Sequence, residues 1–198
     1  MANPLRGVAS DTAYLRSVLA TIPGPIVLVG HSYAGFLISA AAAGDPDVKA
    51  LVYVAAYIPR AGESPADLTY KDPGSLLTGD NLVARPEPTG TDLYVNPATF
   101  LKVYAGGLSP AKAALAAVTQ RPIAASALSE AATVDPPAST PKWDVVALED
   151  NAIPTVTQRF MAQRAHARVV TTHSGHDVPA ASAELVTKVI LDAARSVC

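Results

Sequence analysis

The sequence predicts an α/β fold in which a mostly parallel sheet is flanked by helices. Two runs, residues 25–29 and 48–56, are apolar at nearly every position, which is typical of parallel strands buried on both faces. Small apolar residues at 36–43 lie between them and end at Gly44, so the order strand, helix, strand indicates a crossover unit. The C-terminal residues 182–197 place their apolar side chains on one helical stripe, which suits packing on the sheet.

Length, charge and cysteine content narrow the class of protein. The chain has 198 residues, of which 49% are hydrophobic, enough for one domain with a sizeable core. Its 17 acidic and 15 basic side chains are scattered and give a net charge of -2, so neither nucleic acid nor a membrane is expected as a partner. Cys198 is the single cysteine, which excludes an intrachain disulfide. Without a signal-like N-terminus or a membrane-length apolar run, a cytoplasmic location is predicted.

The remaining core elements follow from local patterns. Ser10 can accept hydrogen bonds from the amides of the next turn, and the apolar residues after it repeat on one helical face. Residues 10–20 are therefore expected to form an amphipathic helix. Strands are expected at 143–148 and 167–172, and a further helix should begin near Pro154.

The segment 57–142 differs from the rest of the chain, because it is rich in proline, glycine and short helical patterns. Asn96 and Ser109 each precede a proline suited to the first helical position, so a helix is expected after each, the second running through Gln120. We predict a single domain, residues 1–198, with a core of residues 1–56 and 143–198. The segment 57–142 is predicted to be an inserted cap subdomain.

The stretch GHSYAG, residues 30–35, lies between the first predicted strand and the following helix. A serine hydroxyl is a weak nucleophile, and hydrolases expose it on a sharp strand-to-helix turn with small residues two positions before and after it. Gly30 and Ala34 occupy these positions, and Ala34 departs from the usual glycine by one methyl group. This setting favours Ser32 as a nucleophile over a simple turn residue.

A general base is expected after the last predicted strand, where a parallel sheet presents ligand-facing loops. His173 and His176 both follow that strand, and His176 lies deeper in the loop, so we favour His176 as the base and His173 as a turn residue. His31, beside the serine, is expected to serve orientation or packing. His166, at a charged helix end, is expected to be solvated.

The acid that orients the base should follow the strand at 143–148. Asp150 is favoured over Glu149, because it lies in the loop and its shorter side chain holds an imidazole more rigidly. Asp177 adjoins the chosen histidine in sequence, and Asp144 lies at the wrong end of its strand. Both are expected to be structural or exposed.

Several stretches of the chain match the pattern of one family: GPIVLVGHSYAG, VKALVYVAAYIPRAGES, TQRPIA, EDNAIP, RFMAQRA and SGHDVP. In them the chain resembles the α/β-hydrolase superfamily, in the esterase branch that also holds plant methyl esterases and hydroxynitrile lyases, and small bacterial esterase-like members above all. The resemblance implies an α/β-hydrolase fold with an inserted cap and no cofactor. It also implies Ser32 as nucleophile, Asp150 as acid and His176 as base.

The resemblance also reveals a difference at the N-terminus. The family places a strand, an HGA-type turn, a helix and another strand, on the order of forty residues, before the position of NPLRG. This chain therefore resembles an N-terminally truncated member. That turn supplies one amide to the oxyanion hole, which leaves the backbone amide of Tyr33 as the remaining donor. Loss of one donor costs about 3 to 4 kcal/mol of transition-state stabilisation, so weak activity is expected.

Without that neighbouring strand, the strand at 25–29 is expected to expose a hydrophobic edge. We expect this edge to be covered either by a second copy of the chain, in a homo-oligomer, or by a rearranged cap or N-terminal segment.

The favoured function is hydrolysis of a small carboxylic ester through an acyl-serine intermediate. Four cap aromatics are candidates for the wall of an apolar substrate pocket, or for cap core: Tyr70, Tyr94, Phe100 and Tyr104. The alternative is a catalytically weak or inactive hydrolase-fold binding protein. A hydroxynitrile lyase ranks lower, because its chemistry, as the resemblance implies, uses a lysine near the histidine, where this chain has Asp177.

Overall fold

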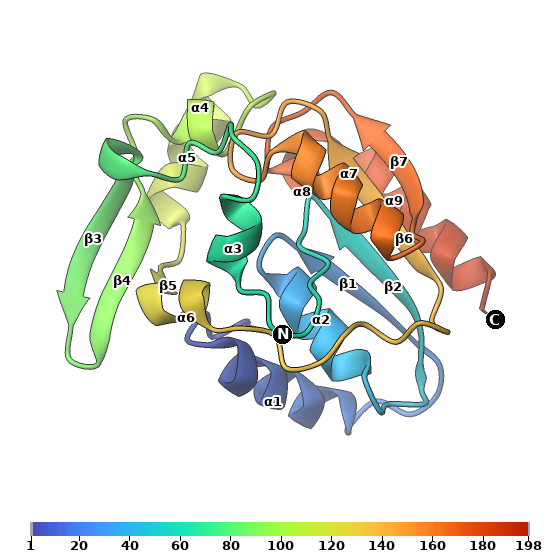
Figure 1. Ribbon diagram of the computed structural model, residues 1–198. Helices are drawn as coiled ribbons and strands as arrows, with labels where there is room; N and C mark the ends of the chain where they lie inside the picture. Colours follow the sequence, from blue (N-terminus) through green and yellow to red (C-terminus); the bar gives the residue numbers. More distant parts are fainter. Residues whose placement is uncertain (1, 198) are drawn as a thin grey trace.

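The central sheet of the protein has four parallel strands in the order β1-β2-β6-β7, as seen in a computed structural model that describes residues 2–197 (Figure 1). The strands are β1 (Ile26–His31), β2 (Val48–Val54), β6 (Lys142–Ala147) and β7 (Arg168–Thr172). Each lies close to its predicted bounds. The predicted α/β class and the parallel sheet are confirmed.

Helices cover both faces of this sheet. They are α1 (Val8–Leu19), α2 (Ala34–Ala42), α7 (Thr155–Arg164), α8 (Val178–Ala181) and α9 (Ala183–Arg195). Leu51 and Tyr53 of β2 belong to the same buried cluster as α2, whereas Val52 packs in a second cluster with α9. Because alternate strand residues point to opposite faces, α2 and α9 lie on opposite sides of the sheet. The predicted C-terminal stripe is confirmed in α9, whose Val186, Val189 and Ala193 are buried.

Helix α1 begins earlier than predicted, and its N-terminus is capped from a distance. Ser10 lies inside the first turn, and its hydroxyl donates to the carbonyl of Gly7 instead of accepting from a free amide. The carboxylate of Glu130 accepts from the amides of Val8 (2.7 Å) and Ala9 (2.9 Å). The sequence pattern missed this contact because the acceptor lies far along the chain.

The segment 57–142 contains a second sheet that was not predicted. Its three strands pair antiparallel in the order β3-β4-β5, and the β3–β4 hairpin extends away from the main sheet (Figure 1). Its elements are α3 (Pro65–Thr69), the 3-10 helix η1 (Gly79–Asn81), β3 (Leu82–Glu87), β4 (Gly90–Val95), α4 (Phe100–Val103), α5 (Pro110–Thr119), β5 (Ile123–Ala124) and α6 (Ala125–Ser129). The hairpin strands are only partly buried, so they lack the continuous apolar run that marked the core strands.

One of the two predicted proline-started helices forms as expected. The Ser109 hydroxyl accepts from the amide of Lys112, and α5 begins at Pro110. The expectation after Asn96 was wrong. The Asn96 side chain accepts from the amide of Ala98 and forms a local turn, and α4 begins only at Phe100.

Within residues 2–197, strand β1 pairs with β2 alone, so one edge of β1 has no strand beside it. The N-terminal segment runs instead to the second sheet, where Leu5 accepts from the amide of Ala124 (2.9 Å) and Arg6 pairs with Asp92 (2.6 Å). Covering of the edge by a second chain stays a prediction. No helix in the described part of the chain has the length and apolarity needed to cross a bilayer.

Candidate active site

Three side chains predicted from the sequence meet at the carboxyl edge of the parallel sheet. Ser32 follows β1, Asp150 follows β6 and His176 follows β7. Nε2 of His176 lies 2.7 Å from the Ser32 Oγ atom, and its Nδ1 lies 2.7 Å from the Asp150 Oδ2 atom. These separations form a continuous chain of hydrogen bonds from carboxylate to imidazole to hydroxyl.

Ser32 sits in a strained turn between β1 and α2. Its φ angle is 54°, in the left-handed region that non-glycine residues rarely adopt. A Cβ atom on Gly30 would lie 2.9 Å from the backbone oxygen of Ala34, and one on Gly35 would lie 1.9 Å from that of Tyr57. Glycine is therefore needed at 30 and 35, whereas alanine fits at 34.

Asp150 is fixed by hydrogen bonds on both carboxylate oxygens. Oδ1 accepts from the amides of Ala152 (2.7 Å) and Ile153 (3.0 Å). Oδ2 accepts from the Gln158 side chain (2.8 Å) as well as facing His176. Gln158 was not singled out from the sequence, because nothing local distinguishes it from other polar residues of a helix.

The N-terminus of α2 presents free amides beside the serine. Among the hydrogen bonds of residues 2–197, none uses the backbone N–H of Tyr33 or of Ala34 as donor. Both residues line the cavity that contains Ser32. Such amides, at the positive end of a helix dipole, are suited to binding an anionic oxygen.

The other histidines occupy different surroundings. His31 is partly buried and lines the cavity, and burial, followed by the proximity of His176, lowers the pKa of His31 to about 4. His173 is exposed and lies 3.3 Å from Glu149, which is also exposed. His166 is exposed, as predicted.

Two acidic side chains that were expected to be structural or exposed are buried to different degrees. Asp144 is almost completely buried, with 1% of its surface exposed, and burial raises its pKa well above the usual range. Neither oxygen of Asp144 has a hydrogen-bond partner among the described residues. Asp177 lines the cavity beside His176, and partial burial raises its pKa too.

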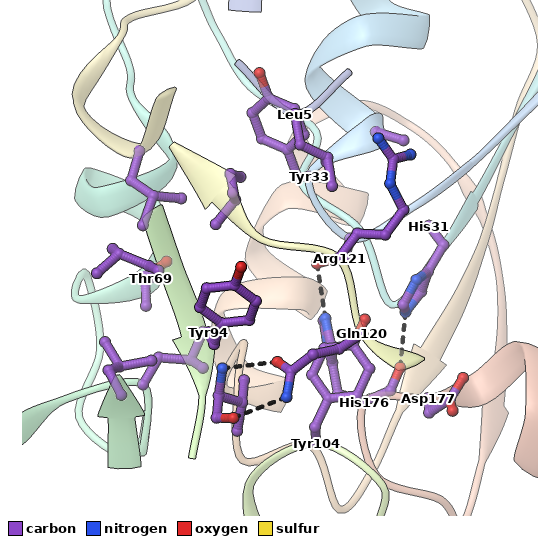
Figure 2. A pocket seen from close by; sticks show the side chains of 18 of the residues that line it. Leu5, His31, Tyr33, Thr69, Tyr94, Tyr104, Gln120, Arg121, His176 and Asp177 are labelled. Atoms are coloured by element: carbon purple, nitrogen blue, oxygen red, sulfur yellow. Dashed lines mark hydrogen bonds between the residues drawn. The ribbon is translucent and has the colours of Figure 1, made fainter. Parts of the chain in front are cut away.

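A cavity of about 520 Å³ opens over Ser32 and His176. The four aromatic residues proposed from the sequence all contribute to it, and Figure 2 shows Tyr94 and Tyr104 in its wall. The side chain of Gln120 is held in place by both backbone groups of Val95, at 2.9 Å each. Six larger aliphatic residues also line the cavity: Leu5, Leu77, Leu82, Leu93, Ile123 and Leu128. Within residues 2–197, no group of three or more His, Cys, Asp or Glu side chains is placed to hold a metal ion.

The sequence was compared with models of known protein families and with curated proteins. The model of the alpha/beta hydrolase family matches residues 3–189. A search of curated protein sequences finds no significant match.

Solved structures share the fold at low sequence identity. Polyneuridine aldehyde esterase superposes with a TM-score of 0.79 at 20% identity, over 96% of this chain and 80% of that one. Tomato methylketone synthase I, complexed with 2-tridecanone, gives 0.77 at 22% identity over 97% and 80%. A pyrethroid hydrolase gives 0.73 at 23% identity over 96% and 78%. Together with the family match over nearly the whole chain, the parallel sheet and the turn at Ser32 lead to one conclusion: the chain belongs to the alpha/beta hydrolase family.

Proposed function

We propose that the protein is a serine hydrolase that cleaves a small-molecule carboxylic ester through an acyl-serine intermediate. The observation that carries this proposal is the chain of two 2.7 Å contacts from Asp150 through His176 to Ser32. The strained φ of Ser32 and the free amides beside it support the same chemistry.

In the first half of the reaction, Ser32 Oγ attacks the ester carbonyl carbon while His176 Nε2 takes the hydroxyl proton. The carbonyl oxygen becomes an oxyanion, which the amide of Tyr33 stabilises at the N-terminus of α2. His176 then returns the proton to the leaving alkoxide, and the alcohol departs.

In the second half, water attacks the acyl-serine, and His176 again accepts and returns the proton, which releases the carboxylic acid and restores Ser32. Asp150 keeps the proton of the neutral imidazole on Nδ1, so that Nε2 presents its lone pair to the hydroxyl. The same carboxylate stabilises the imidazolium that forms in each half of the reaction.

The cavity supports an ester with a sizeable apolar group. Its volume of about 520 Å³ falls in the range that encloses drug-sized ligands, and its wall is formed mainly by aromatic and aliphatic side chains. Two of the structural neighbours are named as an esterase and a pyrethroid hydrolase, which is consistent with this proposal. We propose that the segment 57–142 acts as the cap that encloses this group.

A fluorophosphonate probe tests the activated serine. We expect the intact protein to be phosphonylated on Ser32, as located by peptide mass spectrometry. Ser32→Ala should abolish labelling and lower ester turnover by about 10³-fold or more. Ser17→Ala, which removes an exposed hydroxyl of α1, is the matched control and should label like the wild type.

A panel of p-nitrophenyl esters tests the pocket. The value of kcat/KM should rise from the acetyl to the octanoyl ester, because the longer chain buries more apolar surface.

Labelling absent in the wild type, or unchanged in Ser32→Ala, would overturn the proposed function in favour of a non-catalytic binding protein.

A further inference from the structure

We propose that His31 is a positioning residue for the reaction, which fixes the backbone of His176 by donating a hydrogen bond to its carbonyl oxygen. This inference rests on the proposed function, since it assigns a role within the same site. Nε2 of His31 lies 2.9 Å from the His176 carbonyl oxygen, and Figure 2 shows this contact at the edge of the cavity.

The direction of this hydrogen bond follows from its acceptor. A carbonyl oxygen only accepts, so the proton of His31 lies on Nε2. The low pKa of His31, about 4, keeps the ring uncharged at neutral pH. The ring centroids of His31 and His176 lie 4.9 Å apart, and a charged ring at this distance would oppose the imidazolium that forms on His176.

The position of His31 next to Ser32 allows this hydrogen bond to link the two catalytic loops. His31 is the last residue of β1 and is covalently joined to Ser32. Its bond to the His176 carbonyl therefore ties the loop of the base to the turn of the nucleophile. Within residues 2–197, it is the one hydrogen bond from residues 30–35 to the backbone of residues 173–178.

The Val178 amide donates to the same His176 carbonyl oxygen at 2.8 Å, and further backbone bonds of the loop lead to the segment 57–142. The amide of Gly175 donates to Gly106, and that of Asp177 donates to Tyr104, both at 2.9 Å. These acceptors belong to the segment 57–142, so they hold the base relative to the proposed cap. The His31 bond therefore holds the backbone of His176 relative to the turn of Ser32, in addition to the direct side-chain contact of 2.7 Å between His176 Nε2 and Ser32 Oγ.

The ring of Tyr104 packs on the same group. Its centroid lies 4.7 Å from that of His176 and 6.1 Å from that of His31, with nearly perpendicular planes in both pairs. Packing alone could therefore position the base, and a test must separate the ring of His31 from its hydrogen bond.

Two substitutions make this separation. His31→Phe keeps a flat ring of similar size and removes the donor. His31→Gln removes the ring but places an amide N–H near the position of Nε2. We expect His31→Phe to lower kcat and the rate of phosphonylation of Ser32 by about 10- to 100-fold with little change in KM, as for a slight misplacement of a catalytic group. His31→Gln should restore most of the loss.

Rates are normalised to the folded, titratable fraction, with folding followed by circular dichroism. A second readout is the far-downfield proton resonance of the His176–Asp150 hydrogen bond, which we expect to weaken or broaden in His31→Phe and to persist in His31→Gln. If phenylalanine does not fit, the smaller His31→Leu replaces it in the same comparison.

The outcomes are distinct. Wild-type rates in His31→Phe would overturn the role of His31 and leave the proposed function intact. Equal losses in both variants would assign the effect to ring packing and also overturn the inference. A wild-type protein that does not react with the probe would overturn both the proposed function and this inference.

Discussion

Replacing Asp150 by asparagine should change the state of His176 without changing the shape of the site. The Asp150 Oδ1 atom accepts two backbone amides, so the asparagine oxygen will occupy this side. Its NH₂ group must then face His176 Nδ1, which is left to accept a hydrogen bond. The remaining imidazole proton moves to Nε2, where it blocks proton transfer from Ser32.

The same NH₂ group also meets a second donor. The Gln158 Nε2 atom lies 2.8 Å from Asp150 Oδ2, while its Oε1 atom accepts from the amide of Ala147 at 3.0 Å. Turning the Gln158 amide would relieve one donor conflict and create another at Ala147. Two donors therefore face each other in a buried site, which costs about 1 to 3 kcal/mol of unfolding free energy.

The expected result is a fall in kcat of about 10⁴-fold, the loss produced by the wrong histidine tautomer in serine proteases. Stopped-flow or steady-state hydrolysis of a p-nitrophenyl ester measures the rate, and urea unfolding measures the stability. Gln158→Met is the matched variant, because it removes the amide contact but leaves the carboxylate in place, and it should retain far more activity. If Asp150→Asn retained kcat within tenfold of the wild type, the assigned role of Asp150 would be refuted.

Two further predictions concern stability. Asp144→Val should stabilise the fold by about 1 to 3 kcal/mol at pH 8, because it removes a buried carboxyl without partners. Because its pKa is raised, the Asp144 carboxyl keeps its proton in the native state, whereas in the unfolded state it releases that proton above about pH 4. Wild-type stability therefore falls as the pH rises from about 4 towards the native pKa. The gain should therefore be smaller at pH 4.5, and a gain independent of pH in urea titrations would contradict this account. Gly35→Ala should lower the free energy of unfolding by about 3 kcal/mol or more, because its methyl group would lie 1.9 Å from a backbone oxygen. The control Gly90→Ala, whose nearest contact would be 3.7 Å, should be nearly neutral. Equal thermal unfolding temperatures for the two variants would refute this reasoning.

The candidate site could be predicted from the sequence because each of its residues follows a strand with a clear apolar pattern. Parallel strands bring their carboxyl ends to one edge, so Ser32, Asp150 and His176 could be placed together before any distance was known. The choice of His176 over His173 depended on loop position alone, and the structure leaves His173 exposed near Glu149.

Elements with weaker local signals were missed. The strands of the β3–β4 hairpin are only partly buried, and their residues do not form the apolar runs of the core. The cap of α1 is supplied by Glu130, and no pattern near Val8 announces a carboxylate more than a hundred residues away.

The α/β class, the elbow at Ser32 and the family could be predicted from the amino-acid sequence, because they depend on local periodicity and on short motifs. The need for glycine at position 35 as well as at 30 follows only from the packed fold, since Gly35 contacts Tyr57 from beyond the next strand. The tertiary structure also decided that Gln158 holds Asp150 and that His31 reaches the carbonyl of His176. The His31 contact joins residues 145 positions apart, and the Gln158 contact, although only eight positions apart, depends on how α7 packs beside the loop after β6.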